Sequence, residues 1–154
     1  MRINAKISKW TVFFLILTVW TVGFIFYNSM QNPVESEERS LAIVEHVQPI
    51  LDAEGRMTQK AFNDMIRALA HLAEFAMLGF SLGGLFVSLQ GRAKEKLIRN
   101  VLLVATGVAV ADEILQYFTG RYTDIKDVML DVLGALIGVL IIKAGVKIRN
   151  KKAW

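Results

Sequence analysis

The chain has 154 residues, of which 54% are hydrophobic and 21% charged, and its formal net charge is +4. This composition is too apolar for an ordinary soluble domain of that length. The chain has no cysteine, which excludes disulfides, thiolate metal sites and cysteine nucleophiles.

The first apolar segment runs from about residue 10 to residue 30 and is uncharged between Trp10 and Tyr27. About 20 apolar residues are enough to cross the hydrocarbon core of a bilayer, so this segment predicts a transmembrane helix. A cleaved signal peptide is the alternative. The segment is long for one, however, and no small-x-small cleavage site follows, so we expect a retained membrane helix.

A largely polar segment of about residues 31–66 follows, the largest part of the chain outside the predicted spans. Four apolar residues in it are spaced as on one face of a helix, namely Leu41, Val44, Val47 and Leu51. Pro49 is expected to kink or divide that helix. Residues 52–56 predict a turn, after which Thr58 can cap a helix that continues into the next span. We expect an amphipathic helical hairpin on the outer surface, with a lid over a site as the functional alternative.

Three further apolar segments predict membrane helices at about residues 68–90, 97–118 and 125–146. Residues 1–154 therefore predict one all-α membrane domain with four transmembrane helices. Small residues recur four apart in the last three spans, as Gly79 and Gly83, Gly107 and Ala111, and Gly134 and Gly138. Such pairs allow the backbones of two helices to approach closely in lipid.

Lys and Arg are distributed unevenly between the two sides of the membrane. With the N-terminus in the cytoplasm, the inner segments hold twelve Lys and Arg residues and one acid. The outer segments hold six Lys and Arg residues and thirteen acids. The resulting charges of +11 inside and −7 outside follow the positive-inside rule. We therefore expect a multi-pass protein of the plasma membrane, with both termini cytoplasmic and the inner surface against anionic lipid. A nucleic-acid partner is not expected, because no basic face carries stacking aromatic residues.

Polar and ionisable residues lie within the last three spans, close to their outer ends. They are Arg67, His71 and Glu74, then Asp112, Glu113 and Gln116, then Asp124, Asp127 and Asp131, with Arg121 in the turn between the last two spans. Spacings of three and four residues place the members of a set on one helical face. Charge inside a bilayer is costly unless it is paired or hydrated, so these residues predict one outward-facing site.

The acids of this predicted layer outnumber its cations, which requires protonated acids, a bound cation or a basic group of a ligand. The expected binding residues are Arg67, His71, Glu74, Asp112, Glu113, Gln116, Arg121, Asp127 and Asp131. We assign no metal. A divalent cation, if bound, would take ligands from His71, Glu74, Asp112 and Asp127, and a single histidine suits a hard cation better than zinc.

Three functions remain open for this layer. It could bind a cationic or lipid-anchored ligand, or a partner, at the membrane surface. It could catalyse a reaction on a lipid-linked envelope precursor, with His71 as general base and Arg67 and Arg121 holding a phosphate. The base would then be oriented by Glu74 or by a carboxylate of the third span, Asp112 or Glu113, although no nucleophile stands out. The layer could instead be a structural charge network that fixes the register of three helices.

These motifs resemble those of the VanZ family of bacterial membrane proteins over nearly the whole chain. The residues that carry the resemblance are Arg67, Ala70-His71-Leu72, Glu74-Phe75, Leu78-Gly79, Asp112, Glu113, Gln116, Gly120, Arg121, Asp127, Gly134, Gly138 and the segment NSMQNPVESEERS. Phe75 stands where the family usually has an aromatic residue with a hydroxyl group, and Asp131 where many members have Asn. The resemblance implies a cell-envelope protein. The family takes its name from a member linked to tolerance of lipid-anchored glycopeptide antibiotics such as teicoplanin, and binding of such a ligand is one expectation for this chain.

Overall fold

The protein is described from a computed structural model, which places residues 8–90 and 96–151. These residues form five helices and contain no strand: α1 (Lys9–Ser29), α2 (Pro33–Leu51), α3 (Gln59–Gln90), α4 (Leu97–Phe118) and α5 (Ile125–Lys151). Four of them, α1, α3, α4 and α5, are long and apolar enough to cross a membrane. The predicted all-helical architecture, with four helices that are able to span a membrane, is therefore confirmed.

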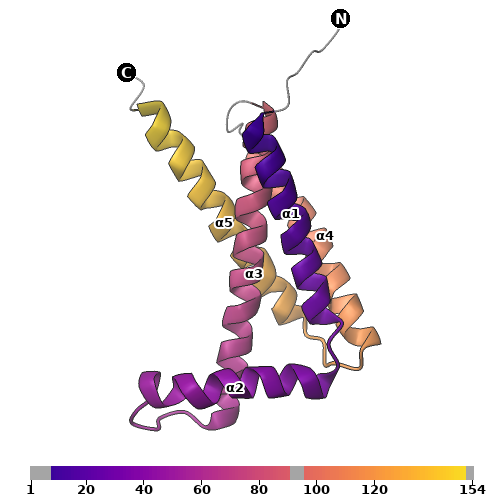
Figure 1. Ribbon diagram of the computed structural model, residues 1–154, viewed down its shortest axis with the longest axis vertical. Coiled ribbons are helices and arrows are strands. Elements are labelled where there is room, and N and C mark those ends of the chain that lie inside the picture. The colour runs from indigo at the N-terminus through magenta and orange to yellow at the C-terminus, as the bar shows by residue number, and fades with distance from the viewer. Residues whose placement is uncertain (1–7, 91–95, 152–154) are drawn as a thin grey trace, which may run out of the picture.

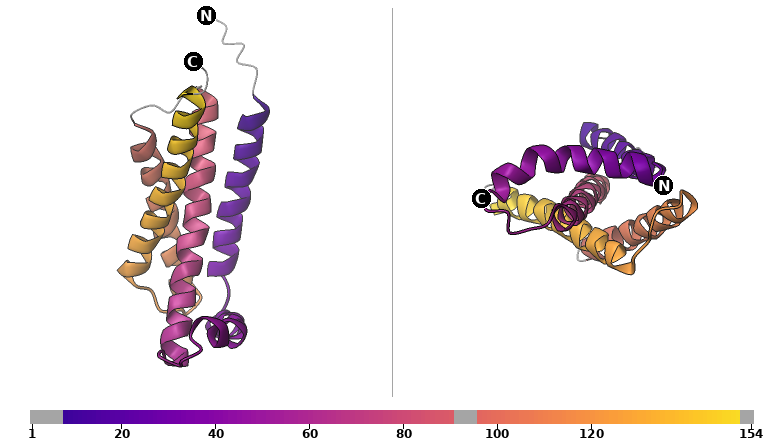
Figure 2. Two further views of the ribbon diagram at one scale, coloured as in Figure 1. Left: turned by 90° about the vertical axis from the view of Figure 1, so that its left-hand side faces the viewer. Right: turned by 90° about the horizontal axis from the view of Figure 1, so that it is seen from below.

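The four long helices form a bundle in which α1, α4 and α5 all pack against α3 (Figure 1). Helix α2 lies across one end of the bundle, where α1 ends and α3 begins, and the turn between α4 and α5 is at the same end (Figure 2). We term this the α2 end. The first residues of α1 and the last residues of α5 lie at the opposite end, which we term the basic end because Lys and Arg are the charged residues described there.

The sequence explains where α2 begins and ends. The Asn32 side chain accepts a hydrogen bond from the Glu35 N–H at 2.9 Å, and Pro33 occupies the first position of the helix, where no N–H is needed. Pro49 is expected from the sequence to kink or divide this helix, and it does not divide it, because α2 continues to Leu51. Pro49 lies in the last turn, where little helix remains to be disrupted.

Three of the four apolar residues expected on the packed face of α2 face the protein. Val44 is buried, and Leu41 and Val47 are half-buried. Leu51 is 68% exposed, since the chain leaves the helix at the next residue. Helix α2 therefore packs against α3 through the middle of its length, and its last turn projects away.

The loop between α2 and α3 is stabilised by hydrogen bonds between the Asp52 side chain and backbone N–H groups of the loop. The Asp52 carboxylate accepts hydrogen bonds from the N–H groups of Arg56 and Met57, each at 2.8 Å. These bonds hold the pKa of Asp52 below its usual range. Gly55 adopts a φ of 65°, a conformation that costs glycine nothing, so the predicted turn is present.

Helix α3 begins well before the membrane-spanning segment that the sequence predicts. The Thr58 hydroxyl accepts a hydrogen bond from the Ala61 N–H at 3.2 Å, and the helix then runs unbroken from Gln59 to Gln90. The expectation that Thr58 caps a helix continuing into the span is confirmed. A single rigid element therefore carries both the contact with α2 and the centre of the bundle.

Glycines bring α3 and α5 into backbone contact. A Cβ atom on Gly79 would overlap the carbonyl oxygen of Ala135, and one on Gly138 would overlap that of Ala76. The close approach expected for these glycines is confirmed. The same expectation is wrong for Gly107, where an added Cβ would have no heavy atom within 4 Å, because this face of α4 points away from the bundle.

The core lies between the four long helices. It is made of the buried residues Ile25, Phe75, Leu78, Leu82, Leu97, Val101, Ala105, Ala109, Ala135 and Val139. Many apolar side chains outside this core, such as Phe13, Ile16 and Leu103, are exposed on the outer faces of the helices. Such surfaces suit contact with lipid, where apolar side chains need no cover.

Candidate functional site

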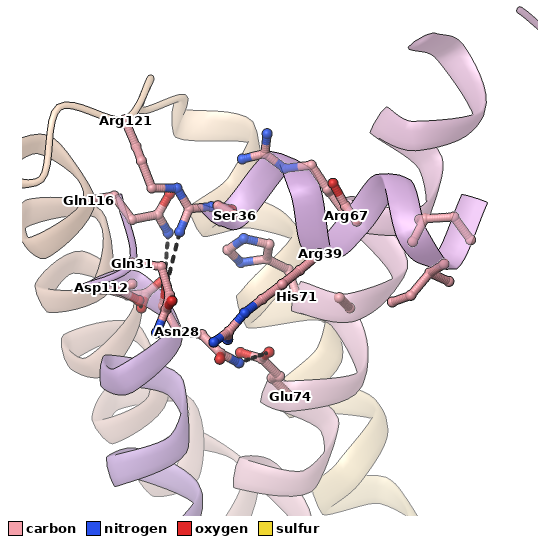
Figure 3. A pocket seen from close by; sticks show the side chains of 15 residues that line it. Asn28, Gln31, Ser36, Arg39, Arg67, His71, Glu74, Asp112, Gln116 and Arg121 are labelled. Carbon is pink, nitrogen blue, oxygen red and sulfur yellow. Dashed lines mark hydrogen bonds between the residues drawn. The ribbon is translucent and has the colours of Figure 1, made fainter. Parts of the chain in front are cut away.

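A cavity of about 260 Å³ opens at the α2 end of the bundle (Figure 3). Five parts of the chain line it. They are the end of α1 with Asn28, Ser29 and Gln31; α2 with Ser36, Arg39, Ser40 and Ile43; α3 with Ile66, Arg67, Ala70, His71 and Glu74; α4 with Asp112 and Gln116; and the α4–α5 turn with Arg121. The cavity is thus assembled from several elements, and no single helix supplies it.

Most of the binding residues expected from the sequence meet at this cavity. Those that line it are Arg67, His71, Glu74, Asp112, Gln116 and Arg121. Asp131 is fully buried and contacts His71. Glu113 and Asp127 are not among the lining residues. Glu113 follows Asp112 directly, so the helical repeat turns its side chain about 100° away from the cavity. Both of its carboxylate oxygens are buried without a hydrogen-bond partner in the described part of the chain.

His71 is paired with a carboxylate of the last helix. Its Nδ1 lies 3.2 Å from Oδ1 of Asp131, and the two side chains are 17% and 0% exposed. A proton on Nδ1 is donated to Asp131 in this geometry, which leaves Nε2 as an acceptor. The expectation that Glu74 or a carboxylate of the third span orients His71 is therefore wrong. Asp131 takes that place because α5 packs so closely against α3.

Asp112 is the most fully satisfied acid of the cluster. It is 1% exposed, and its Oδ1 accepts a hydrogen bond from the Ser29 hydroxyl. Its Oδ2 accepts a second bond from the Gln116 side-chain amide at 2.8 Å. Asp112 therefore joins the end of α1 to α4 in the buried part of the site.

Further polar contacts tie the end of α1 to its neighbours. The Asn28 amide donates to Glu74 at 2.8 Å, and the Asn28 carbonyl oxygen accepts from Nη1 of Arg121 at 3.3 Å. The Thr119 hydroxyl donates to the Ser29 carbonyl oxygen at 3.1 Å. The α4–α5 turn is thereby held against α1, and Gly120 within it adopts a φ of 79°, as suits the predicted Gly-Arg turn.

Three arginines line the cavity, and they come from three different elements (Figure 3). In the described residues, none of Arg39, Arg67 and Arg121 has a carboxylate within the 4.0 Å of an ion pair. Burial lowers the pKa of Arg121 from its ordinary value, and the nearby positive charge of Arg67 lowers it further. The Nε of Arg121 is also buried without an acceptor. The guanidinium group of Arg39 lies over the Tyr27 ring, and Arg121 donates to the Asn28 carbonyl oxygen. The cavity therefore offers three guanidinium groups that have no carboxylate partner among the described residues.

A family model described as VanZ/LLP1 matches residues 12–147. The chain belongs to the VanZ/LLP1 family. The match includes every residue that lines the cavity. Comparisons with curated proteins and with solved structures found no match. Together with the four helices that can span a membrane, the family assignment supports a multi-pass membrane protein.

The VanZ/LLP1 chain holds one group of potential metal ligands among its described residues. His71, Asp112 and Asp131 each offer a ligand atom, and these atoms lie within 4.8 Å of one another. The ligand set expected from the sequence also contains His71 and Asp112. It has Glu74 and Asp127 where the structure has Asp131. The fit is incomplete, since both oxygens of Asp112 already accept hydrogen bonds from protein side chains.

Several lining residues of this VanZ/LLP1 site were missed by sequence reasoning. Asn28 and Ser29 follow directly after the apolar segment of the first span. Two adjacent polar residues at the outer end of a span are a signal from which they could have been predicted. Arg39, Ser36 and Ser40 belong to the segment NSMQNPVESEERS that carries part of the family resemblance, but nothing in the local sequence distinguishes them from their polar neighbours. Their place at the cavity depends on how α2 crosses the end of the bundle.

Proposed function

We propose that this protein binds the anionic group of a lipid-linked envelope molecule in the cavity at the α2 end. The main support is the set of Arg39, Arg67 and Arg121, which line one cavity without a carboxylate partner in the described residues. The planar fork of arginine matches the oxygens of phosphate and carboxylate groups. The excess of acids in the sequence is explained by protonated acids, by a bound cation or by a basic group of a ligand. Among the described residues, two acids, Glu74 and Asp112, line the cavity against three arginines, so the charge of the lining favours an anion.

The distribution of charge supports an outward-facing α2 end. The acids of the described residues lie in the α2 half of the molecule, whereas the basic end carries Lys9, Lys96, Arg99, Lys143, Lys147 and Arg149. Lys and Arg are retained on the cytoplasmic side of membrane proteins. In this orientation the cavity opens to the outer surface of the plasma membrane.

The depth of the cavity supports a ligand that is itself anchored in lipid. Asp112 lies six residues before Phe118, the last residue of α4, which is about 9 Å along the helix axis. The inner part of the cavity therefore lies within about 9 Å of the boundary between lipid headgroups and hydrocarbon. A lipid-linked molecule can place its charged group there while its chains stay in the bilayer. A lipid-anchored glycopeptide of the teicoplanin type is one such ligand, and tolerance would follow from its sequestration.

Replacing Arg67 and Arg121 together with glutamine is expected to weaken the binding of a polyprenyl phosphate. A hydrogen bond to a charged group contributes roughly 1.5–3 kcal/mol, so the loss should be at least about tenfold in Kd. Calorimetry with the full chain in detergent measures it. The matched control is Arg56→Gln, since Arg56 is exposed in the α2–α3 loop and paired with Glu54.

Two comparison ligands make this test specific. A neutral polyprenol should bind much more weakly than its phosphate to the wild-type protein, because it lacks the group that the arginines would hold. A lipoglycopeptide of the teicoplanin type should bind, and cells expressing the double variant should lose any tolerance that the wild-type protein confers. Equal affinity for phosphate and polyprenol, or a double variant that behaves like Arg56→Gln, would contradict the proposal.

The pair of His71 and Asp131 supports a second candidate function, catalysis on the bound lipid-linked molecule. Asp131 would hold the imidazole so that Nε2 can take a proton from an attacking hydroxyl group or water. The arginines would stabilise negative charge on the group under attack. The electron pair of the broken bond would leave with the departing group, which His71 could then protonate.

The variant His71→Asn separates catalysis from binding. If the protein is an enzyme, this variant should still bind the polyprenyl phosphate but lose product formation by about 100-fold or more, the usual contribution of a general base. Mass spectrometry of lipid-linked precursors incubated with purified protein is the measurement. Absence of any product from the wild-type protein across a broad panel of such precursors would leave binding as the proposed function.

A further inference from the structure

A second cavity of about 500 Å³ lies between α1, α3 and α5 at the basic end of the bundle. Phe14 of α1, Phe80 of α3 and Ile142 of α5 form its walls. Helix α5 leans away from α1 toward this end, which opens the space between them (Figure 1). We refer to this cavity as the basic-end groove.

Two glycines shape the groove. A Cβ atom on Gly84 would overlap the ring of Phe14, so the absence of a side chain there lets α1 seat its aromatic ring against α3. Gly145 has a different role, because a Cβ atom added to it would have no heavy atom within 4 Å. The groove beside Gly145 is therefore open, and a larger side chain at this lining position has room to extend into it.

The polar groups of the groove lie toward one end. The Ser88 hydroxyl donates to the Leu85 carbonyl oxygen at 2.8 Å, and the Ser8 side chain accepts from the Trp10 N–H at 3.1 Å. Arg149 is the charged residue of the lining. A stable water needs two to four polar partners, so water is a poor occupant of the apolar part. An apolar chain with an anionic group at one end matches this distribution.

The charges around Arg149 also favour an anionic occupant. Asp131, the last acid along α5, is 18 residues away, or about 27 Å along the helix axis. Lys147 lies close by on the same helix. Trp10 is a residue type enriched where membrane meets water, which suits the position of a lipid headgroup. Anionic lipid is attracted to such clusters of Lys and Arg.

We propose that the basic-end groove binds one anionic phospholipid, with an acyl chain against Phe14, Phe80 and Ile142 and the phosphate on the guanidinium of Arg149. This site is separate from the cavity at the α2 end, and it does not depend on what that cavity binds. The lipid would fill the space between α1 and α5, two helices that meet chiefly through α3.

Native mass spectrometry of the full chain, released from detergent and titrated with phosphatidylglycerol, tests this proposal. Phosphatidylcholine serves as the neutral comparison. The wild-type protein should retain one phosphatidylglycerol with an affinity roughly tenfold above that for phosphatidylcholine, the effect of one charge-assisted contact. Gly145→Phe should abolish this retention. The matched control is Gly107→Phe, which adds the same ring on the open face of α4, where an added Cβ also meets nothing.

A second variant tests the headgroup contact without filling the groove. Arg149→Gln should remove the preference for phosphatidylglycerol, whereas Lys96→Gln, at an exposed residue before α4 and outside the lining, should keep it. Equal lipid retention by Gly145→Phe and Gly107→Phe would overturn the proposal, as would an unchanged preference in Arg149→Gln. A wild-type dimer that Gly145→Phe converts to a monomer would also overturn it, because a second copy would then occupy the groove.

Discussion

The variant Gly138→Ala is expected to lose about 3 kcal/mol or more of stability, at the upper end of the cost of overpacking a core. The added Cβ atom would overlap the carbonyl oxygen of Ala76, and it would also press on the backbone nitrogen of Phe80. Neither backbone atom can move away without shifting α3 as a whole. Alanine has a higher helix propensity than glycine by about 1 kcal/mol, so any loss must come from this contact.

Gly107→Ala is the matched control for this prediction. Gly107 also lies within a membrane helix, but its added Cβ would have no neighbour within 4 Å, so the variant should be as stable as the wild-type protein or slightly more stable. Thermal unfolding in detergent, together with the monodisperse fraction on gel filtration, measures both. Similar behaviour of the two variants would mean that α3 and α5 do not pack in the described way.

The variant Asp112→Ala is expected to lose about 2 kcal/mol, because it leaves the buried side-chain amide of Gln116 without its acceptor. The Ser29 hydroxyl group also loses its bond to Asp112, but it can still donate to the carbonyl oxygen of Ile25. Asp112→Asn should cost less than about 1 kcal/mol, since its amide can donate to Ser29 while its oxygen accepts from Gln116. The same thermal measurement applies, with the exposed Asp64→Ala as the control.

The pair of variants at Asp112 also separates a structural role from a functional one. A folded Asp112→Asn variant that no longer binds the polyprenyl phosphate would assign the carboxylate to ligand binding. Loss of folding in both variants would favour a charge network that only fixes the helices. Stability of Asp112→Ala equal to that of Asp64→Ala would contradict the buried hydrogen bonds themselves.

The membrane helices were predictable because their signal is local. A long apolar segment such as residues 97–118 has few structural alternatives, and the described helix α4 has the same bounds. Polar residues spaced three or four apart on one helix also share a face in any context. For this reason Arg67, His71 and Glu74 could be placed together before the structure was known.

The pairing of these residues across helices was not predictable in the same way. Which acid meets His71 depends on the rotation and distance of α5 relative to α3, which the contacts at Gly134 and Gly138 determine. The sequence places Asp127 and Asp131 on one face, yet only Asp131 reaches the histidine. The contribution of Arg39 depends on the path of α2, which local spacing does not encode.

Because α2 lies across the end of the bundle, the cavity has two kinds of lining residue. Those on α2 can be substituted at little structural cost, and those inside the bundle cannot. Helix α2 supplies Arg39, Ser36 and Ser40 to the cavity, but its packing is mainly against α3 and most of its surface is exposed. His71, Asp112 and Asp131 are instead enclosed by the bundle, where each substitution has a structural cost. Related proteins could therefore acquire new ligand preferences by mutating one surface helix, while the chemistry beneath it stays the same.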